Sequence, residues 1–192
     1  MTRIVSGSAG GRRLSTPTGA GTRPTSDRVR EALFSRLDHL DVLSGARVLD
    51  LYAGSGALAF EAISRGAAHA LLVESDRGAA AVARRNAHSL GWSAVVEIRV
   101  DTVEKVLLGG PSHPADLVCL DPPYDLPDDR LADVLALLVG HRWLAPEALV
   151  VVERSSRSPQ PTWPVGLAEA GERRYGETKV WFADAPGPDE VA

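Results

Sequence analysis

Short apolar runs alternate with amphipathic segments along most of the chain. Five runs have the length and near-continuous hydrophobic character of buried strands: 47–52, 69–73, 95–100, 115–120 and 148–153. The segments between them place apolar residues at helical spacing: 58–65, 78–90, 102–108 and 128–143. Strands that alternate with helices are typical of a parallel sheet covered by helices on both faces.

The two ends of the chain depart from this alternation. Residues 3–14 contain a glycine-rich turn between short apolar stretches, which predicts an N-terminal β-hairpin. A loop rich in Thr, Gly and Pro then leads into a helix that begins near Ser26 or Asp27. Residues 167–183 contain two further strand patterns around a turn at 175–177, which predicts a hairpin at the sheet edge.

These elements together predict one α/β fold. We expect a Rossmann-like, mostly parallel, twisted sheet of seven strands with helices on both faces, a C-terminal edge hairpin and a small N-terminal hairpin extension. The predicted boundaries are 1–24 for the basic extension, 25–185 for the main domain and 186–192 for a disordered tail.

Composition narrows the class of protein. The chain has 192 residues, of which 44% are apolar, enough for one domain with a proper core. It has no apolar run long enough to span a membrane and no signal-peptide pattern, so a cytoplasmic location is expected. The single cysteine, Cys119, excludes an internal disulfide, and the five histidines lack ligand spacing, so no metal is expected.

Charge is distributed unevenly along the chain. The formal net charge is −4, yet residues 1–36 hold seven arginines against two acidic residues. A basic N-terminal segment on an acidic body is typical of a protein that binds a polyanion. The alternative is that arginine is simply the preferred basic residue here, since lysine occurs only at positions 105 and 179.

Asp121-Pro122-Pro123-Tyr124, directly after the predicted strand 115–120, is the main candidate for chemistry. Neither proline can donate an N–H to a sheet, so the strand must end in a stiff corner. Asp121 and the Pro122 carbonyl group can accept the two hydrogens of an amine on a flat ring, and Tyr124 can stack on that ring. We predict that this corner aims the amine at an electrophile; the alternative is an ordinary exposed turn.

A glycine-rich loop, Gly54-Ser55-Gly56, lies between a predicted strand and a predicted helix. Glycine lets the backbone approach a ligand closely, and the amides that begin a helix favour negative charge. With Ala59 the spacing fits the dinucleotide fingerprint G-x-G-x-x-A, and Glu74 follows Gly54 by 20 residues, where a ribose-binding acid is expected. A nicotinamide-dependent oxidoreductase is therefore a rival interpretation.

Carboxylates at the strand ends favour a different cofactor. Asp50 would repel a pyrophosphate but attract a ligand with an amino group and a sulfonium. We therefore predict S-adenosylmethionine, with Glu74 on its ribose and with Asp101 and Thr102 near its adenine; the alternative for Asp101 is an exposed strand-end carboxylate without a ligand. The predicted cofactor-binding residues are Asp50, Tyr52, Ala53, Gly54, Ser55, Gly56, Glu74, Ser75, Asp101 and Thr102.

Taken together, the motifs resemble class I methyltransferases, and more narrowly the bacterial small-subunit ribosomal RNA guanine-N2 methyltransferase family. The resemblance covers nearly the whole chain. It is carried by R-I-V-S-G at 3–7, G-R-R-L at 11–14, R-P-T at 23–25, V-R-E-A-L-F at 29–34, D-L-Y-A-G-S-G at 50–56 and D-P-P-Y at 121–124. Adenine-N6 and other amino methyltransferases share the last two motifs, so the N-terminal motifs narrow the match.

This resemblance implies methyl transfer from S-adenosylmethionine to the exocyclic N2 amine of a guanine in 16S ribosomal RNA, either naked or within a partly or fully assembled small subunit. It implies a monomeric enzyme whose N-terminal region contacts RNA through Arg3, Arg12, Arg13, Arg23, Thr25, Arg28 and Arg30. Three alternatives stay open: an amino methyltransferase acting on adenine N6 or a protein amide, the nicotinamide oxidoreductase, and a non-catalytic RNA-binding assembly factor.

Overall fold

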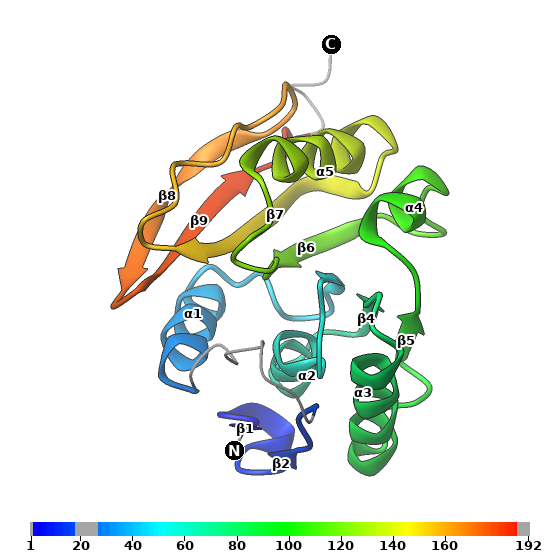
Figure 1. The fold of residues 1–192 in the computed structure, drawn as a ribbon. Coiled ribbons are helices and arrows are strands. Elements are labelled where there is room, and N and C mark those ends of the chain that lie inside the picture. The colour runs from blue at the N-terminus through cyan, green and yellow to red at the C-terminus, as the bar shows by residue number, and fades with distance from the viewer. Residues whose placement is uncertain (1, 18–26, 188–192) are drawn as a thin grey trace.

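The computed structural model describes residues 2–17 and 27–187, and a seven-stranded sheet forms its centre (Figure 1). The strands lie in the order β5-β4-β3-β6-β7-β9-β8. Their bounds are β3 Arg47–Leu51, β4 His69–Val73, β5 Val96–Arg99, β6 Ala115–Leu120, β7 Leu144–Ser155, β8 Ala168–Tyr175 and β9 Thr178–Asp184. The five neighbouring strands β5, β4, β3, β6 and β7 run parallel to one another. Strand β9 is antiparallel to both of its neighbours, β7 and β8. The predicted α/β fold is thus confirmed.

Helices cover both faces of this sheet. Figure 1 shows α1, α2 and α3 on one face and α4 and α5 on the other. Their bounds are α1 Asp27–His39, α2 Ala57–Ser64, α3 Arg77–Leu90, α4 Val103–Leu108 and α5 Asp128–Gly140. Each face has its own hydrophobic cluster, one with Phe34 and Phe60 and the other with Leu135 and Trp143. Burial on both faces explains why the strands are almost continuously apolar in sequence.

The last helix is shorter than predicted, because α5 ends at Gly140 and not at Trp143. Arg142 takes a left-handed backbone conformation with φ 57°. Trp143 then turns back into the core, where its indole N–H donates to the Leu107 carbonyl group at 2.9 Å. In the sequence Trp143 continues the apolar spacing of the helix, which is why the prediction was wrong. Strand β7 accordingly begins at Leu144, earlier than predicted.

The predicted N-terminal hairpin is present and docks against α2. It consists of β1 (Thr2–Arg3), the short 3-10 helix η1 (Gly7–Ala9) and β2 (Arg13–Leu14). Ile4 and Leu14 belong to the same hydrophobic cluster as Phe60 of α2, so the hairpin shares the core of the main domain. Gly7 has φ +83°, and a Cβ there would lie 1.9 Å from the Ser64 carbonyl oxygen, so the close approach requires glycine.

Some predictions fall outside the described residues. The helix cap at Ser26, the domain boundary at 24–25 and most of the tail at 186–192 are among them. Within the described part, Asp27 begins α1, and its carboxylate accepts a hydrogen bond from the Arg30 guanidinium at 2.8 Å.

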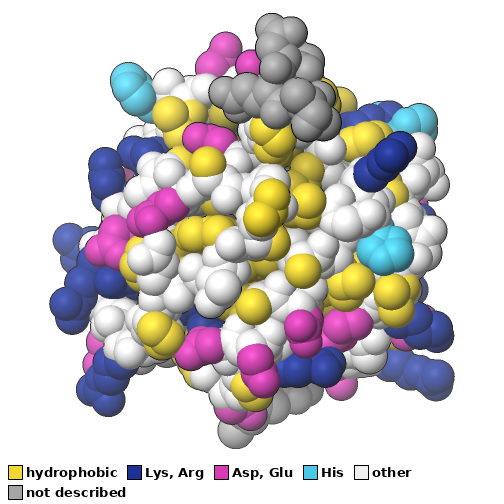
Figure 2. Space-filling model, turned by 90° about the horizontal axis from the view of Figure 1, so that it is seen from above, with side chains coloured by type: hydrophobic (Ala, Val, Ile, Leu, Met, Phe, Trp, Pro, Cys, Tyr) yellow, Lys and Arg dark blue, Asp and Glu magenta, His cyan; other side chains and the backbone are white. Residues whose placement is uncertain are grey.

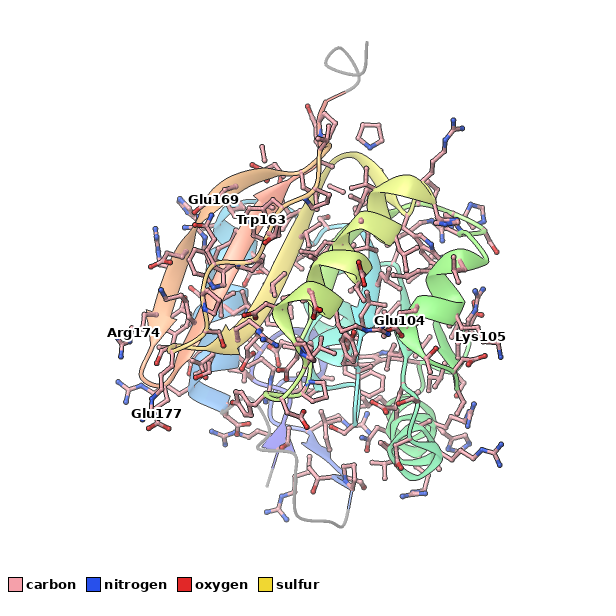
Figure 3. The ribbon with its side chains drawn as sticks, turned by 45° about the horizontal axis from the view of Figure 1, so that its top comes forward. Glu104, Lys105, Trp163, Glu169, Arg174 and Glu177 are labelled. Atoms are coloured by element: carbon pink, nitrogen blue, oxygen red, sulfur yellow. The ribbon has the colours of Figure 1, made fainter. Side chains whose placement is uncertain are left out.

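Charged residues line β8, which is the free edge of the antiparallel end of the sheet. Figure 3 labels Glu169 and Arg174 on this strand. The pairing register shifts between Glu169 and Gly171, and Gly171 has φ +108°. Charge and irregular pairing both discourage a further strand from adding to this edge.

Candidate active site

Three neighbouring strands end at the same level of the sheet. Leu51, the last residue of β3, pairs with the last residue of β4 and with the last residue of β6. The Asp121 N–H also donates to the Leu51 carbonyl group at 3.4 Å. The glycine loop (Gly54-Ser55-Gly56), Glu74 and Asp121 therefore follow adjacent strands at one carboxyl edge, which is where open α/β sheets bind ligands.

The two glycines of this loop are required for different reasons. Gly54 has φ +55°, and a Cβ there would meet no atom of residues 2–17 and 27–187 within 4 Å, so open space lies beside its backbone in this part of the chain. Gly56 has φ +83°, and its Cβ would lie 2.5 Å from Phe60 and 2.7 Å from Leu72. Gly54 can therefore admit a ligand, whereas Gly56 lets the loop pack onto the core.

Glu74 holds the glycine loop and the start of α3 in place. Its Oε2 accepts the Gly54 N–H at 2.8 Å, and its Oε1 accepts the Asp76 N–H at 2.7 Å. The side chain is half-buried, while the neighbouring Ser75 is exposed. Each carboxylate oxygen has a second lone pair, so Glu74 can also accept hydrogen bonds from the hydroxyl groups of a ribose.

Asp50 is a buried acid with one unsatisfied oxygen. It is 1% exposed; Oδ2 accepts the Ala59 N–H at 3.1 Å, and Oδ1 has no partner among the described residues. Its pKa is raised to about 8, mainly by burial; the Ala59 hydrogen bond opposes this shift, and the charges of Asp121 and Glu74 add to it. Three carboxylates thus converge on this edge. An orphaned acceptor among like charges suits a cationic ligand, such as the amino group and sulfonium of S-adenosylmethionine.

Tyr52 leaves β3 in a strained conformation. It is not glycine, yet its φ is +62°. Its hydroxyl group is buried without a partner among the described residues, and burial raises its pKa to about 12, with the charge of Glu104 adding to the shift. A left-handed residue of this kind costs about 1–3 kcal/mol, and such strain gathers at functional sites.

Asp101 and Thr102 follow β5 and have structural partners of their own. Asp101 pairs with Lys105 at 2.6 Å, and this contact holds the pKa of the Asp101 carboxyl group below its usual value. The Thr102 hydroxyl group caps α4 by accepting the Lys105 N–H at 3.4 Å. Figure 3 shows Lys105 on α4 beside Glu104. The contact of Asp101 and Thr102 with adenine stays a prediction.

The segment that directly follows the Asp121–Tyr124 corner is held by Arg154, a residue that sequence reasoning missed. Pro122 is buried, while the Tyr124 side chain is 55% exposed. Arg154, at the end of β7, is buried and donates to the Leu126 carbonyl group and to Asp128, each at 2.9 Å. The only signal in the sequence is that Arg154 directly follows a strongly apolar run; the pairing of that run with β6 comes from the structure.

The residues predicted to bind RNA divide into three groups. The side chains of Arg3, Arg12, Arg13 and Arg28 are exposed. Arg23 and Thr25 lie outside the described residues.

Arg30 corrects the prediction, because its side chain is 0% exposed and cannot reach RNA. It pairs with Asp27 at 2.8 Å and with Glu61 at 3.6 Å, and it donates to the Arg3 carbonyl group. We therefore assign Arg30 to holding the hairpin against α1 and α2. In the sequence, Arg30 is one arginine among several in the basic N-terminal segment. The sequence therefore did not distinguish it from its exposed neighbours.

Helix α3 adds basic residues that the N-terminal charge count overlooked. Arg77, Arg84 and Arg85 are exposed, and the helix contains no acidic residue. The Arg12 guanidinium donates to the Ser89 carbonyl group, which brings the hairpin alongside the last turn of this helix. Figure 2 looks at the molecule from above, where several acidic side chains gather along the lower edge of the view.

Other features lie away from the carboxyl edge. A cavity of about 400 Å³ is lined by residues at the amino ends of β3, β4 and β6, including Arg47, His69 and His113. Across residues 2–17 and 27–187, no group of three or more His, Cys, Asp or Glu side chains is arranged to hold a metal ion. Over the same ranges, no helix is both long and apolar enough to cross a membrane.

Comparison with known proteins gives consistent relatives. The family described as "Conserved hypothetical protein 95" matches residues 2–184. Ribosomal RNA small subunit methyltransferase D of Escherichia coli K12 is 37% identical over 191 residues, which cover 98% of this chain and 93% of the relative. The protein of the same name from Haemophilus influenzae is 35% identical, covering 82% of this chain and 80% of the relative.

Solved structures show the same fold. The structure of yhhF from Escherichia coli has a TM-score of 0.83 and 34% identity, and covers 97% of this chain and 98% of its own. An RNA methyltransferase from Salinibacter ruber, solved in complex with S-adenosyl-L-homocysteine, has a TM-score of 0.64 and 22% identity, and covers 88% of this chain and 96% of its own.

Proposed function

This chain belongs to the Conserved hypothetical protein 95 family, and we propose that it transfers a methyl group from S-adenosylmethionine to the exocyclic N2 amine of a guanine in 16S ribosomal RNA. The family resemblance carried by the sequence motifs is confirmed by relatives named ribosomal RNA small subunit methyltransferase D. With this substrate, the proposal includes a cytoplasmic location, because ribosomal subunits are assembled there.

One observation carries the proposal: the amine-gripping corner and the acidic glycine loop follow adjacent strands that end in register. Asp121 is hydrogen-bonded to the last residue of β3, and its charge acts on Asp50. Two reactants bound at these neighbouring strand ends become an aligned pair, which converts a bimolecular step into an effectively unimolecular one.

The residues present fit S-adenosylmethionine, which when bound supplies an electrophilic methyl group on a sulfonium. Asp50 offers a buried carboxyl oxygen that no described residue satisfies, Glu74 offers further lone pairs beside the open backbone of Gly54, and Asp101 follows the next strand. A nicotinamide dinucleotide suits this edge less well, because its pyrophosphate would face three converging carboxylates.

Asp121 and its neighbours orient the amine. The exocyclic amine of guanine is a poor nucleophile, because its lone pair is delocalised into the ring. Asp121 and the Pro122 carbonyl group accept its two hydrogens, aim its lone pair, and leave Asp121 placed to take the proton that is released. The exposed ring of Tyr124 can stack on the base, a contact of about 1–3 kcal/mol.

RNA binding is assigned to the exposed arginines of the hairpin and of α1. Arg3, Arg12 and Arg13 belong to the hairpin, and Arg28 lies in the first turn of α1. Each phosphate contact makes affinity fall with salt, so replacing Arg13 with alanine should reduce both RNA affinity and its salt dependence.

A methyl-transfer assay tests the proposal directly. The purified protein is incubated with tritiated S-adenosylmethionine and one of four acceptors from cells that lack it: naked 16S rRNA, small subunits, DNA or total protein. We expect label in rRNA or small subunits, recovered as N2-methylguanine after digestion, and the stronger of these two acceptors identifies the substrate form. Label in DNA, in protein or in no acceptor would contradict the proposal.

A further inference from the structure

Asn86 of α3 connects the N-terminal hairpin to the glycine loop. Its side chain is buried, with 2% exposed. Its Oδ1 accepts the Ser15 N–H at 2.9 Å, and its Nδ2 donates to the Ser15 carbonyl group at 3.0 Å and to the Ser55 carbonyl group at 3.1 Å. Ser15 directly follows β2 of the hairpin, and Ser55 is the middle residue of the glycine loop Gly54-Ser55-Gly56.

The chemistry of the amide makes this connection specific. Asparagine has two donor hydrogens and one acceptor oxygen, and all of them are used here on backbone groups. An aspartate of the same shape would still accept from Ser15 but could donate to neither carbonyl group. A shift of Ser55 relative to α3 must therefore break a buried hydrogen bond or pull on the group that also holds Ser15.

Further polar anchors of the hairpin lie on α2. Glu61 accepts the Val5 N–H at 2.7 Å and the Ser6 N–H at 3.0 Å. Ser64 accepts the Ala9 N–H at 2.9 Å through its hydroxyl group. These contacts fix the hairpin without touching the glycine loop, so they provide a control for the Asn86 connection.

We propose that Asn86 is a positioning residue that couples cofactor binding to RNA binding. A ligand held by the glycine loop fixes the Ser55 carbonyl group, which fixes the Asn86 amide and with it Ser15. The hairpin that carries Arg12 and Arg13 is thereby held in its RNA-binding position. Because coupling free energy is reciprocal, RNA on the hairpin raises cofactor affinity by the same factor. The inference rests on the proposed function, which puts the cofactor at the loop and RNA on the hairpin.

Binding measurements with S-adenosylhomocysteine test this coupling. The dissociation constant of a fluorescent 16S rRNA fragment is measured with and without saturating S-adenosylhomocysteine. For the unaltered protein we expect the ratio of the two constants to be about fivefold or more, the lower end of typical coupling. Asn86→Asp keeps one hydrogen bond to Ser15 and loses the bond to Ser55, so its ratio should fall below about twofold.

Ser64→Ala is the matched control. It removes a hairpin anchor of similar burial that does not touch the glycine loop. We expect weaker RNA binding with and without S-adenosylhomocysteine and an unchanged ratio, in contrast to Asn86→Asp. Thermal unfolding of both variants confirms that each is folded. If the ratio of the two dissociation constants in Asn86→Asp equalled that of the unaltered protein, the inference would be overturned.

Hydrogen exchange provides a measurement that needs no variant. S-adenosylhomocysteine should slow exchange of the Ser15 amide, which donates to Asn86, at least severalfold relative to the Ala9 amide on Ser64. Equal protection of both amides, or a coupling ratio of one in the unaltered protein, would overturn the inference and leave the proposed methyl transfer standing. Failure of the unaltered protein to bind either ligand would overturn the proposed function as well.

Discussion

The two ends of the parallel sheet differ in a way that identifies the site. At the carboxyl end, Asp50 is buried with an oxygen that has no partner in the described part of the chain, and Tyr52 has a strained backbone. The cavity of about 400 Å³ opens at the amino ends of β3, β4 and β6 and runs along β5, where Arg99 is already paired with Glu97 at 2.7 Å. A cavity shows that there is space. A site is marked by groups whose cost is not offset inside the protein, as at Asp50 and Tyr52. None of the described residues that line the cavity has a left-handed non-glycine backbone or a buried side-chain atom without a partner.

The largest effect is expected from Asp121→Ala. Removing the acceptor that aims the amine should lower kcat by about 100-fold or more, as losses of a single catalytic hydrogen bond do. The affinity for S-adenosylhomocysteine, measured by calorimetry, should stay within about twofold, because Asp121 holds the amine and its charge only adds to the crowding around Asp50.

Asp121→Asn is the matched variant. Its amide oxygen still accepts one hydrogen of the amine, so it should retain more activity than the alanine variant in the same single-turnover assay. Full turnover by Asp121→Ala would show that the corner does not position the amine, and the contrast between the two ends of the sheet would lose its main support.

Asp50→Asn should raise the stability of the protein and lower its affinity for S-adenosylhomocysteine. Burial raises the pKa of Asp50 from its ordinary value of 3.8 to about 8, so the folded state keeps a proton that the unfolded state releases. Stability of the unaltered protein is therefore lost as pH rises from about 4 to about 8. Asparagine has no proton to release, so its advantage in urea unfolding should grow over this window to a few kcal/mol.

The same substitution should weaken binding of S-adenosylhomocysteine by about tenfold or more, because Asp50 can give up its proton and face the ligand's amino group as a carboxylate, whereas the amide stays neutral. Gain of stability with loss of affinity is the signature of a residue kept for its ligand. If the stability difference between Asp50→Asn and the unaltered protein did not change with pH, Asp50 would be ionised in the folded protein. The three carboxylates would then not repel one another appreciably.

The order of the elements and the site motifs were predictable because they rest on local rules. Apolar runs mark strands, and Asp121-Pro122-Pro123-Tyr124 must stop a ladder. The end of α5 was not predictable, because Trp143 is apolar whether it extends a helix or begins a turn into the core. Nor could the sequence separate buried Arg30 from exposed Arg28, since burial depends on contacts with Glu61, which lies 31 residues away.

Two glycine variants distinguish the glycine that is needed for core packing from the glycine that leaves room for a ligand. Gly56→Ala puts a methyl group 2.5 Å from Phe60 at φ +83°, so overpacking should lower stability by about 1–3 kcal/mol. The methyl group of Gly54→Ala meets no atom of the described residues within 4 Å, so its φ of +55° is what opposes it, at about 1–2 kcal/mol. Gly54→Ala should therefore be the more stable of the two and yet bind S-adenosylhomocysteine more weakly than the unaltered protein. Equal losses of stability would contradict the division of roles.

The smallest effect is expected at the amino end of the sheet. His69 and His113 are exposed and line the cavity of about 400 Å³, and the carboxyl-end groups lie at the far ends of the same strands. Replacing both with alanine should change kcat/KM and stability within about twofold and 0.5 kcal/mol, the usual range for surface substitutions. A tenfold loss in the same methyl-transfer assay would mean that the cavity contacts the RNA. Both ends of the sheet would then take part in the reaction, and the amino end would not be a structural support alone.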